Sequence, residues 1–100
     1  MTMKDAFIER RYELRGGLEV LVRLEGPRPG ERGDFRCDYE IVWPDRVRRF
    51  YAGGVDEVQA LYLAMKSVHA ELLFSPEGRR GEITWLGSSD LGLPVADSTA

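Results

Sequence analysis

Side chains able to perform nucleophilic chemistry are scarce in this sequence. It has one cysteine, Cys37, and one histidine, His69, and a thiol beside an imidazole can form a nucleophile–base pair. Both residues fall on apolar faces of predicted elements, however, where a free cysteine usually acts as a small buried side chain. We therefore interpret Cys37 as a core thiol and His69 as a histidine at the edge of the core. We assign no catalytic residue.

The sequence does not indicate a metal or nucleotide site either. One cysteine and one histidine cannot form a Cys/His zinc site within one chain. Neither the G-x-G-x-x-G pattern nor the P-loop pattern of nucleotide-binding loops occurs. We therefore expect no cofactor and no metal.

Charged residues offer two further possibilities. Asp38 and Glu40 share the outward face of a predicted strand, and paired carboxylates can perform acid–base catalysis. Neighbouring predicted strands carry arginines and glutamates on that face, so we interpret it as a solvated surface of mixed charge. The arginines within residues 46–49 could contact phosphate, but the net charge of −3 argues against nucleic-acid binding.

Arg10 is the residue that fits its element least well. Residues 7–15 alternate like a half-buried strand, and Arg10 falls on the apolar face of that strand. Three accounts stay open. A β-bulge near Phe7-Ile8 could shift the register, or the arginine could lie at the edge with its head in water. Alternatively, Arg10 is buried and paired with Asp90 or Glu71, which would tie the first strand to the C-terminal region.

The elements that position these residues follow a β-β-β-β-α order. Apolar and polar residues alternate over four segments, and Gly16-Gly17 and Pro44-Asp45 indicate short turns between them. Residues 26–33, with two prolines and three glycines, are predicted to be a flexible loop without strand or helix. We predict an α+β fold in which a long helix covers one face of a four-stranded antiparallel meander. The predicted strands are residues 6–15, 18–25, 34–43 and 46–52.

A long helix is predicted over residues 56–74. Asp56 and Gln59 resemble a capping box at its start, and Pro76 and Gly78 end it. Apolar residues at helical spacing are predicted to face the sheet: Val58, Leu61, Tyr62, Met65, Val68, His69 and Leu72. The opposite face is also apolar, so either the C-terminal segment or a partner covers it, and the commonest such partner is a second copy. This candidate interface consists of Ala60, Leu63, Ser67, Ala70 and Phe74.

The remaining organisation is simple. Residues 82–86 are predicted to form a short fifth strand, followed by a structured loop and a frayed tail at 96–100. One hundred residues fit one domain, with an ordered core at about residues 6–95. No apolar run is long enough to cross a bilayer, and no secretory signal is evident. A single cysteine fits a reducing compartment, so we expect a cytoplasmic protein.

Four segments together resemble a known family: IERRYELRGG, VDEVQALYLAM, SPEGRRGEITWLG and DLGLPV. Over about residues 8–95 the chain is similar to a family of small, stand-alone bacterial domains of unknown function. The resemblance implies a bacterial cytoplasmic protein with a compact α+β fold, and it implies no catalytic residues. The motif-like positions, for which the resemblance implies structural roles, are Arg10, Trp85, Gly87, Asp90 and Gly92.

Two functions follow from these observations. The first is a non-enzymatic protein-interaction module, homodimeric or acting as an antitoxin-like or immunity-like partner, because the helix has an apolar face to spare. The alternative is a binder of a small anionic ligand, or a minor enzyme, with a pocket between sheet, helix and C-terminal loop. The residues expected to line that pocket are Arg10, Tyr12, His69, Trp85 and Asp90.

Overall fold

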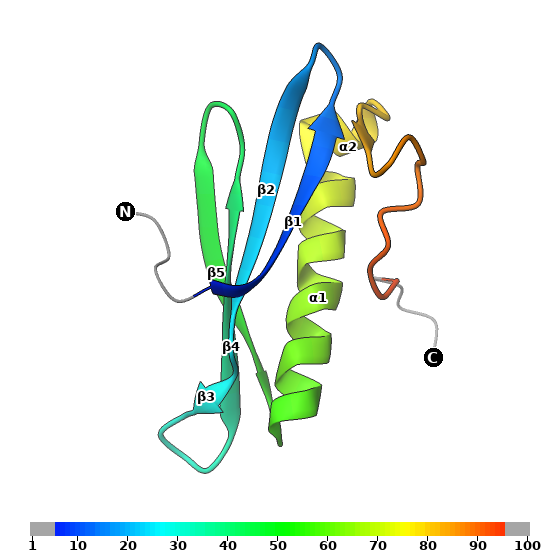
Figure 1. Cartoon of the computed structure of the whole chain (residues 1–100). Helices are drawn as coiled ribbons and strands as arrows, with labels where there is room; N and C mark the ends of the chain where they lie inside the picture. The colour runs from blue at the N-terminus through cyan, green and yellow to red at the C-terminus, as the bar shows by residue number, and fades with distance from the viewer. Residues whose placement is uncertain (1–5, 96–100) are drawn as a thin grey trace.

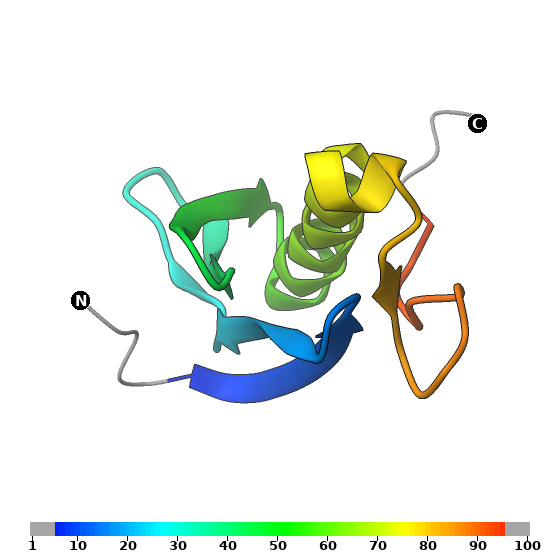
Figure 2. The ribbon, with the colours of Figure 1, turned by 90° about the horizontal axis from the view of Figure 1, so that it is seen from above.

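The computed structural model describes residues 6–95, which form a curved antiparallel sheet with one long helix packed on its concave side (Figures 1 and 2). The α+β class is therefore confirmed. The strands are β1 (Ala6–Leu14), β2 (Leu18–Glu25), β3 (Arg28–Pro29), β4 (Phe35–Val42), β5 (Val47–Gly54) and β6 (Ile83–Thr84). The helices are α1 (Glu57–Phe74) and the short α2 (Pro76–Arg79).

The predicted meander is formed by β1, β2, β4 and β5, each antiparallel to the next. β6 adds to the outer edge of β1, as the expected fifth strand. The prediction that residues 26–33 hold no strand is wrong, because β3 lies within them. β2 is last paired with β4 at Leu24 and Tyr39, and β3 then continues along the same side of β4. Proline is tolerated there because a strand of two residues needs few backbone donors.

The start of α1 follows from its capping residues. The Asp56 carboxylate accepts the Gln59 N–H at 2.8 Å, and the Gln59 side chain accepts the Val55 N–H at 2.7 Å. These bonds satisfy donors that the first turn of a helix leaves free. The predicted helix bounds are accordingly confirmed to within one residue.

The face that α1 turns to the sheet differs from the predicted one. Its fully buried residues recur every four positions, and the predicted inner residues Val58 and Tyr62 are exposed instead. The reason is close contact with β5: a Cβ on Gly54 would lie 2.5 Å from the Ala60 backbone nitrogen. Only small residues allow the helix to approach so closely, so an alanine-rich line faces the sheet. That line consists of Ala60, Ala64, Val68 and Leu72.

The outer face of the sheet carries a row of alternating charges across four strands. Glu9, Arg23, Glu40 and Arg49 lie directly opposite one another in register. Arg23 contacts Glu9 at 2.7 Å, and Arg49 contacts Glu40 at 2.8 Å. The mixed charge of this face agrees with the sequence, but Glu40 is 0 % exposed rather than solvated. A buried carboxylate needs cationic partners, and the two arginines supply them.

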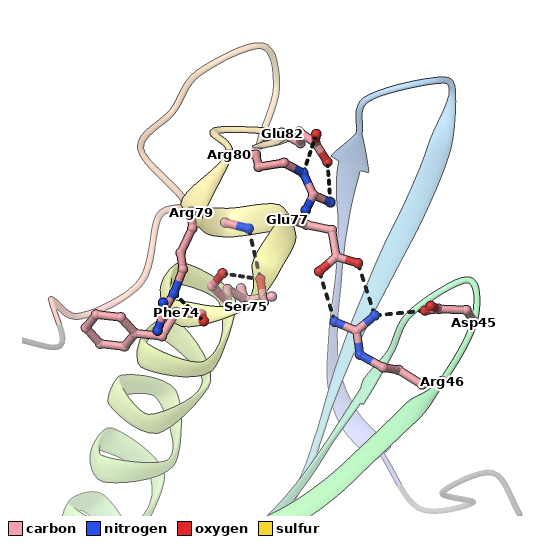
Figure 3. Close-up of polar contacts among 10 residues, drawn as sticks. Asp45, Arg46, Phe74, Ser75, Glu77, Arg79, Arg80 and Glu82 are labelled. Carbon is pink, nitrogen blue, oxygen red and sulfur yellow. Dashed lines mark hydrogen bonds and ion pairs between the residues drawn. The ribbon is translucent and has the colours of Figure 1, made fainter.

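The end of α1 is fastened to the β4–β5 turn by side chains (Figure 3). Ser75 Oγ donates to the Leu72 carbonyl at 2.7 Å and accepts the Gly78 N–H at 2.9 Å, which joins α1 to α2. Glu77 on α2 forms a two-pronged ion pair with Arg46, at 3.0 and 2.9 Å. The C-terminus of α1 is therefore held against the start of β5, next to Arg46.

The C-terminal segment (residues 85–95) runs along the side of α1 that is away from β5 (Figures 1 and 2). Leu91 is part of the buried core, and Trp85 and Leu93 pack against that core. β6 pairs with the β1 edge at Glu13 and Leu14, and the C-terminal segment contacts β1 through the side chains of Arg10 and Tyr12.

Candidate functional site

Arg10 lies on the inner face of β1, where the sequence placed it. A register shift between Ala6 and Ile8 is present, as the bulge account expected. The guanidinium donates to the carbonyls of Leu91 at 3.1 Å and Gly92 at 2.7 Å. It also stacks 3.9 Å from the centre of the Trp85 ring. The tie between the first strand and the C-terminal segment, which was one of the three accounts, is thus present.

The partner predicted for that tie is wrong. Asp90 accepts the Gly92 N–H at 2.9 Å in a local turn, and Glu71 is occupied by Arg48. Two backbone carbonyls take the place of the expected carboxylate as acceptors for the Arg10 guanidinium. Tyr12 adds to the same anchor by donating its hydroxyl to the Leu91 carbonyl at 2.9 Å.

The structure brings together three of the five residues predicted to line an anionic pocket, and it leaves the other two apart. Arg10, Tyr12 and Trp85 converge on the C-terminal segment, but they bind the chain itself: both hydrogen-bonding side chains donate to its carbonyls. Asp90 is exposed, and His69 lies half-buried on α1. Three surface depressions, of about 560, 440 and 310 Å³, are lined by other residues. The geometry around Arg10 thus favours a structural anchor over a ligand site.

Cys37 is a core thiol, as interpreted from the sequence. It is fully buried on β4 and donates to the Glu25 carbonyl at 3.4 Å. Burial, with smaller contributions from Asp38 and Glu25, raises the pKa of the Cys37 thiol to about 11. A nucleophilic cysteine requires the opposite shift, toward the thiolate. Within residues 6–95, moreover, no three His, Cys, Asp or Glu side chains are grouped closely enough to hold a metal ion.

The surface that stands out is the open edge of β5. Among the strands described, β5 pairs with β4 alone, over an uninterrupted register of eight residues. The turn closes with the Trp43 N–H donating to the Arg46 carbonyl at 2.8 Å. Since hydrogen-bonded and non-hydrogen-bonded pairs alternate in an antiparallel ladder, the free backbone groups belong to alternate residues. Those residues are Val47, Arg49, Tyr51 and Gly53.

The arginines of this edge strand are paired with carboxylates of the same molecule. Arg48 contacts Glu71 on α1 at 2.9 Å, and Arg49 contacts Glu40 at 2.8 Å. Glu71 also accepts a hydrogen bond from the Tyr39 hydroxyl; burial and this bond raise the pKa of Tyr39 above its usual range. The arginines of β5 are thus neutralised within the molecule. Phe50, which follows them on β5, is 52 % exposed.

One side of α1 borders this edge. Glu71 reaches Arg48, and Phe74 shares with Arg48 and Trp43 the lining of the depression of about 310 Å³. At about 100° per residue, four residues on this side fall within about 60° of one another. We call them the α1 flank: Leu63, Ser67, Ala70 and Phe74. They are four of the five residues predicted as an interface.

Exposure along the α1 flank is graded. Leu63, Ser67 and Ala70 are half-buried, and Phe74 is 65 % exposed. The fifth predicted residue, Ala60, was wrongly placed: it is 0 % exposed and packs beneath Gly54. The flank therefore forms one wall beside the open edge, rather than the outermost face of the helix. The predicted meander already made residues 46–52 an edge strand, but the sequence did not show that the C-terminal segment would pack on the β1 side and leave this edge open.

Fold and site together define a small α+β domain in which β6 pairs with part of one sheet edge, the β5 edge is open, and the described residues assemble no catalytic group. Residues 8–95 match a family described as a domain of unknown function (DUF6968), so the chain belongs to that family. The expected membership of an uncharacterised small-domain family is thereby confirmed. No curated protein and no solved structure matches the chain. Within the described part, neither helix has the length and apolar character needed to cross a bilayer.

Proposed function

We propose that this chain is a non-enzymatic protein-interaction module whose binding surface is the open edge of β5 together with the α1 flank. The observation that carries the proposal is the edge itself. Eight residues of regular strand leave alternate N–H and C=O groups unpaired beside an exposed phenylalanine. Such an edge binds an added strand through main-chain hydrogen bonds, while neighbouring pockets select its side chains.

The other edge of the sheet supports this reading by contrast. On the β1 side, β6 pairs with Glu13 and Leu14, and the C-terminal segment packs beside them. On the β5 side, the described chain supplies no strand, proline or bulge. Open edges invite association with other chains, so natural proteins usually block those that they do not use.

The test is amide hydrogen exchange at Arg49 and Tyr51, whose N–H groups point away from β4. We expect both amides to exchange quickly in the dilute chain and to be protected at high protein concentration or after addition of an extract of the source cells. A Tyr51→Pro variant removes one edge donor and should abolish the protection. Tyr51→Thr, which keeps the N–H, is the matched control. Equal, rapid exchange of both amides under all conditions would refute the proposal.

A further inference from the structure

We infer that the strand accepted by β5 is β5 of a second copy of this chain, in an antiparallel pairing whose two-fold axis passes through Phe50. This inference rests on the proposed function of the edge and names its occupant. The partner choice follows first from charge. Arg46, Arg48 and Arg49 already have carboxylate partners at 2.8–2.9 Å, so the edge offers no spare cation to attract an acidic segment. A neutralised edge can instead meet its own copy.

Backbone geometry restricts the possible registers. Only residues with free edge groups can bond across the new pair, so odd-numbered residues of one copy must face odd-numbered residues of the other. A two-fold axis at Arg48 or Arg49 would place an arginine against itself, which is unfavourable. An axis at Phe50 avoids this conflict, as does one at Tyr51, but only the Phe50 axis also brings the two exposed Phe50 rings together. It pairs Phe50 with its copy and Arg49 with Tyr51 of the other copy, while Val47 faces Gly53.

This register gives every exposed aromatic residue of the edge a suitable neighbour. Phe50 is half-exposed on the helix side, with the Arg48 guanidinium 5.2 Å from its ring centre. Two such rings meeting at the axis would bury each other's exposed faces. On the outer side, the second copy's Arg49 would lie beside Tyr51, whose ring already has Arg36 stacked at 3.8 Å. Arginine–aromatic contacts are favourable in such positions.

The α1 flank supplies an independent argument for the same axis. α1 touches β5 at Gly54 through Ala60, and again at Arg48 through Glu71. Phe50 therefore lies opposite the stretch of helix between Ser67 and Ala70. A two-fold axis at Phe50 therefore passes near this stretch of α1, and it places the α1 flanks of the two copies side by side and antiparallel. The small residues Ser67 and Ala70 then meet near the axis and let the helices approach, while Leu63 meets Phe74 on either side.

The inference is tested by sedimentation equilibrium of the purified full chain over a concentration series, with no other protein present. We expect a monomer–dimer equilibrium for the wild type. Phe50→Lys and Phe50→Glu, tested separately, should each raise the dissociation constant at least about tenfold, because like charges then meet at the axis. An equimolar mixture of the two variants should restore the dimer, since lysine then faces glutamate. Circular dichroism checks that both variants are folded.

Three results would overturn the second-copy inference. One is a wild type that stays monomeric at all concentrations, and another is a dimer that persists in both variants. The third is two monomeric variants that fail to pair when mixed. If the variants do not fold, the concentration series of the wild type and of Tyr51→Pro decides, since a dimer indifferent to that proline is not joined at β5. Protection of Arg49 and Tyr51 by a cell extract alone would leave the proposed function standing with a different partner.

Discussion

Arg10 joins two parts of the chain that are about 80 residues apart in sequence, with hydrogen bonds that span 81 and 82 positions. Arg10→Ala should lower the free energy of unfolding by about 1.5–3 kcal/mol, the usual range for hydrogen bonds from a charged group. A double-mutant cycle with Trp85→Leu should show coupling of about 0.5–2 kcal/mol from the stacked pair. Urea titration measures both. The neighbouring Arg11→Ala, which removes an exposed ion pair with Glu19, is the control and should be nearly neutral. Strictly additive effects of Arg10→Ala and Trp85→Leu would contradict the contact.

Cys37 determines part of the response to alkaline pH. Its folded pKa of about 11 lies above the ordinary value of 9.0, so folding favours the protonated thiol. The stability that this group contributes is complete below pH 9 and is lost as the pH rises through 11, by at most about 1.4 kcal/mol per pH unit. Urea titrations from pH 8 to 11 should show a steeper loss for the wild type than for Cys37→Ala. Parallel curves for the two proteins would contradict this assignment.

Single residues also mark what the sequence can and cannot reveal. Alternation along β1 and β4 correctly placed Arg10 and Cys37 on the inner face, because side-chain direction in a strand follows parity alone. The same parity placed Glu40 outside, correctly, but suggested that it is solvated. Its burial depends on arginines from β2 and β5, and no local pattern reports which side chains from other strands will lie over it.

At the level of elements, the position of α1 depends on one glycine. A Cβ on Gly54 would meet the Ala60 backbone nitrogen at 2.5 Å, whereas a Cβ on Gly53 would meet only the Phe35 carbonyl at 3.6 Å. Gly54→Ala should therefore lower the free energy of unfolding by about 1–3 kcal/mol through overpacking. Gly53→Ala should change it by less than about 0.5 kcal/mol. Thermal or urea unfolding of the two variants decides, and equal effects would show that α1 does not depend on this contact.

The same glycine explains why the helix was oriented incorrectly from sequence. The prediction gave most weight to the large apolar side chains of α1. The face that it assigned to the sheet is therefore centred about a quarter turn around the helix from the face that is buried. The buried line instead begins with Ala60 and Ala64, and at Ala60 the helix backbone lies so close to β5 that only glycine fits at position 54. Element limits, in contrast, were predictable for α1, β1, β2 and β4, because caps, turns and alternation are local signals.

At the scale of the whole molecule, the two edges of the sheet have different surroundings. The β1 edge pairs with β6 at Glu13 and Leu14 and is packed by the C-terminal segment through Leu91, whereas the β5 edge is left open beside the α1 flank. The meander was predictable and makes β1 and β5 the two edge strands, but which of them stays open depends on where residues 85–95 pack, and that is a property of the complete fold. Four of the residues predicted as an interface therefore lie beside this edge, but the sequence did not single out the open strand next to them.

The covered edge gives the last prediction. Leu91 is 3 % exposed and supplies the carbonyl that accepts bonds from Arg10 and Tyr12, whereas Leu86 in the same segment is 78 % exposed. Leu91→Ala should lower the free energy of unfolding by about 2–4 kcal/mol, as for other buried leucines. Leu86→Ala, the matched control, should be nearly neutral. If the C-terminal segment belongs to the cooperative core, the loss in Leu91→Ala will appear in one unfolding transition, followed by circular dichroism in urea. A Leu91→Ala protein as stable as Leu86→Ala would mean that residues 85–95 do not close the β1 edge, and the contrast between the two edges would then disappear.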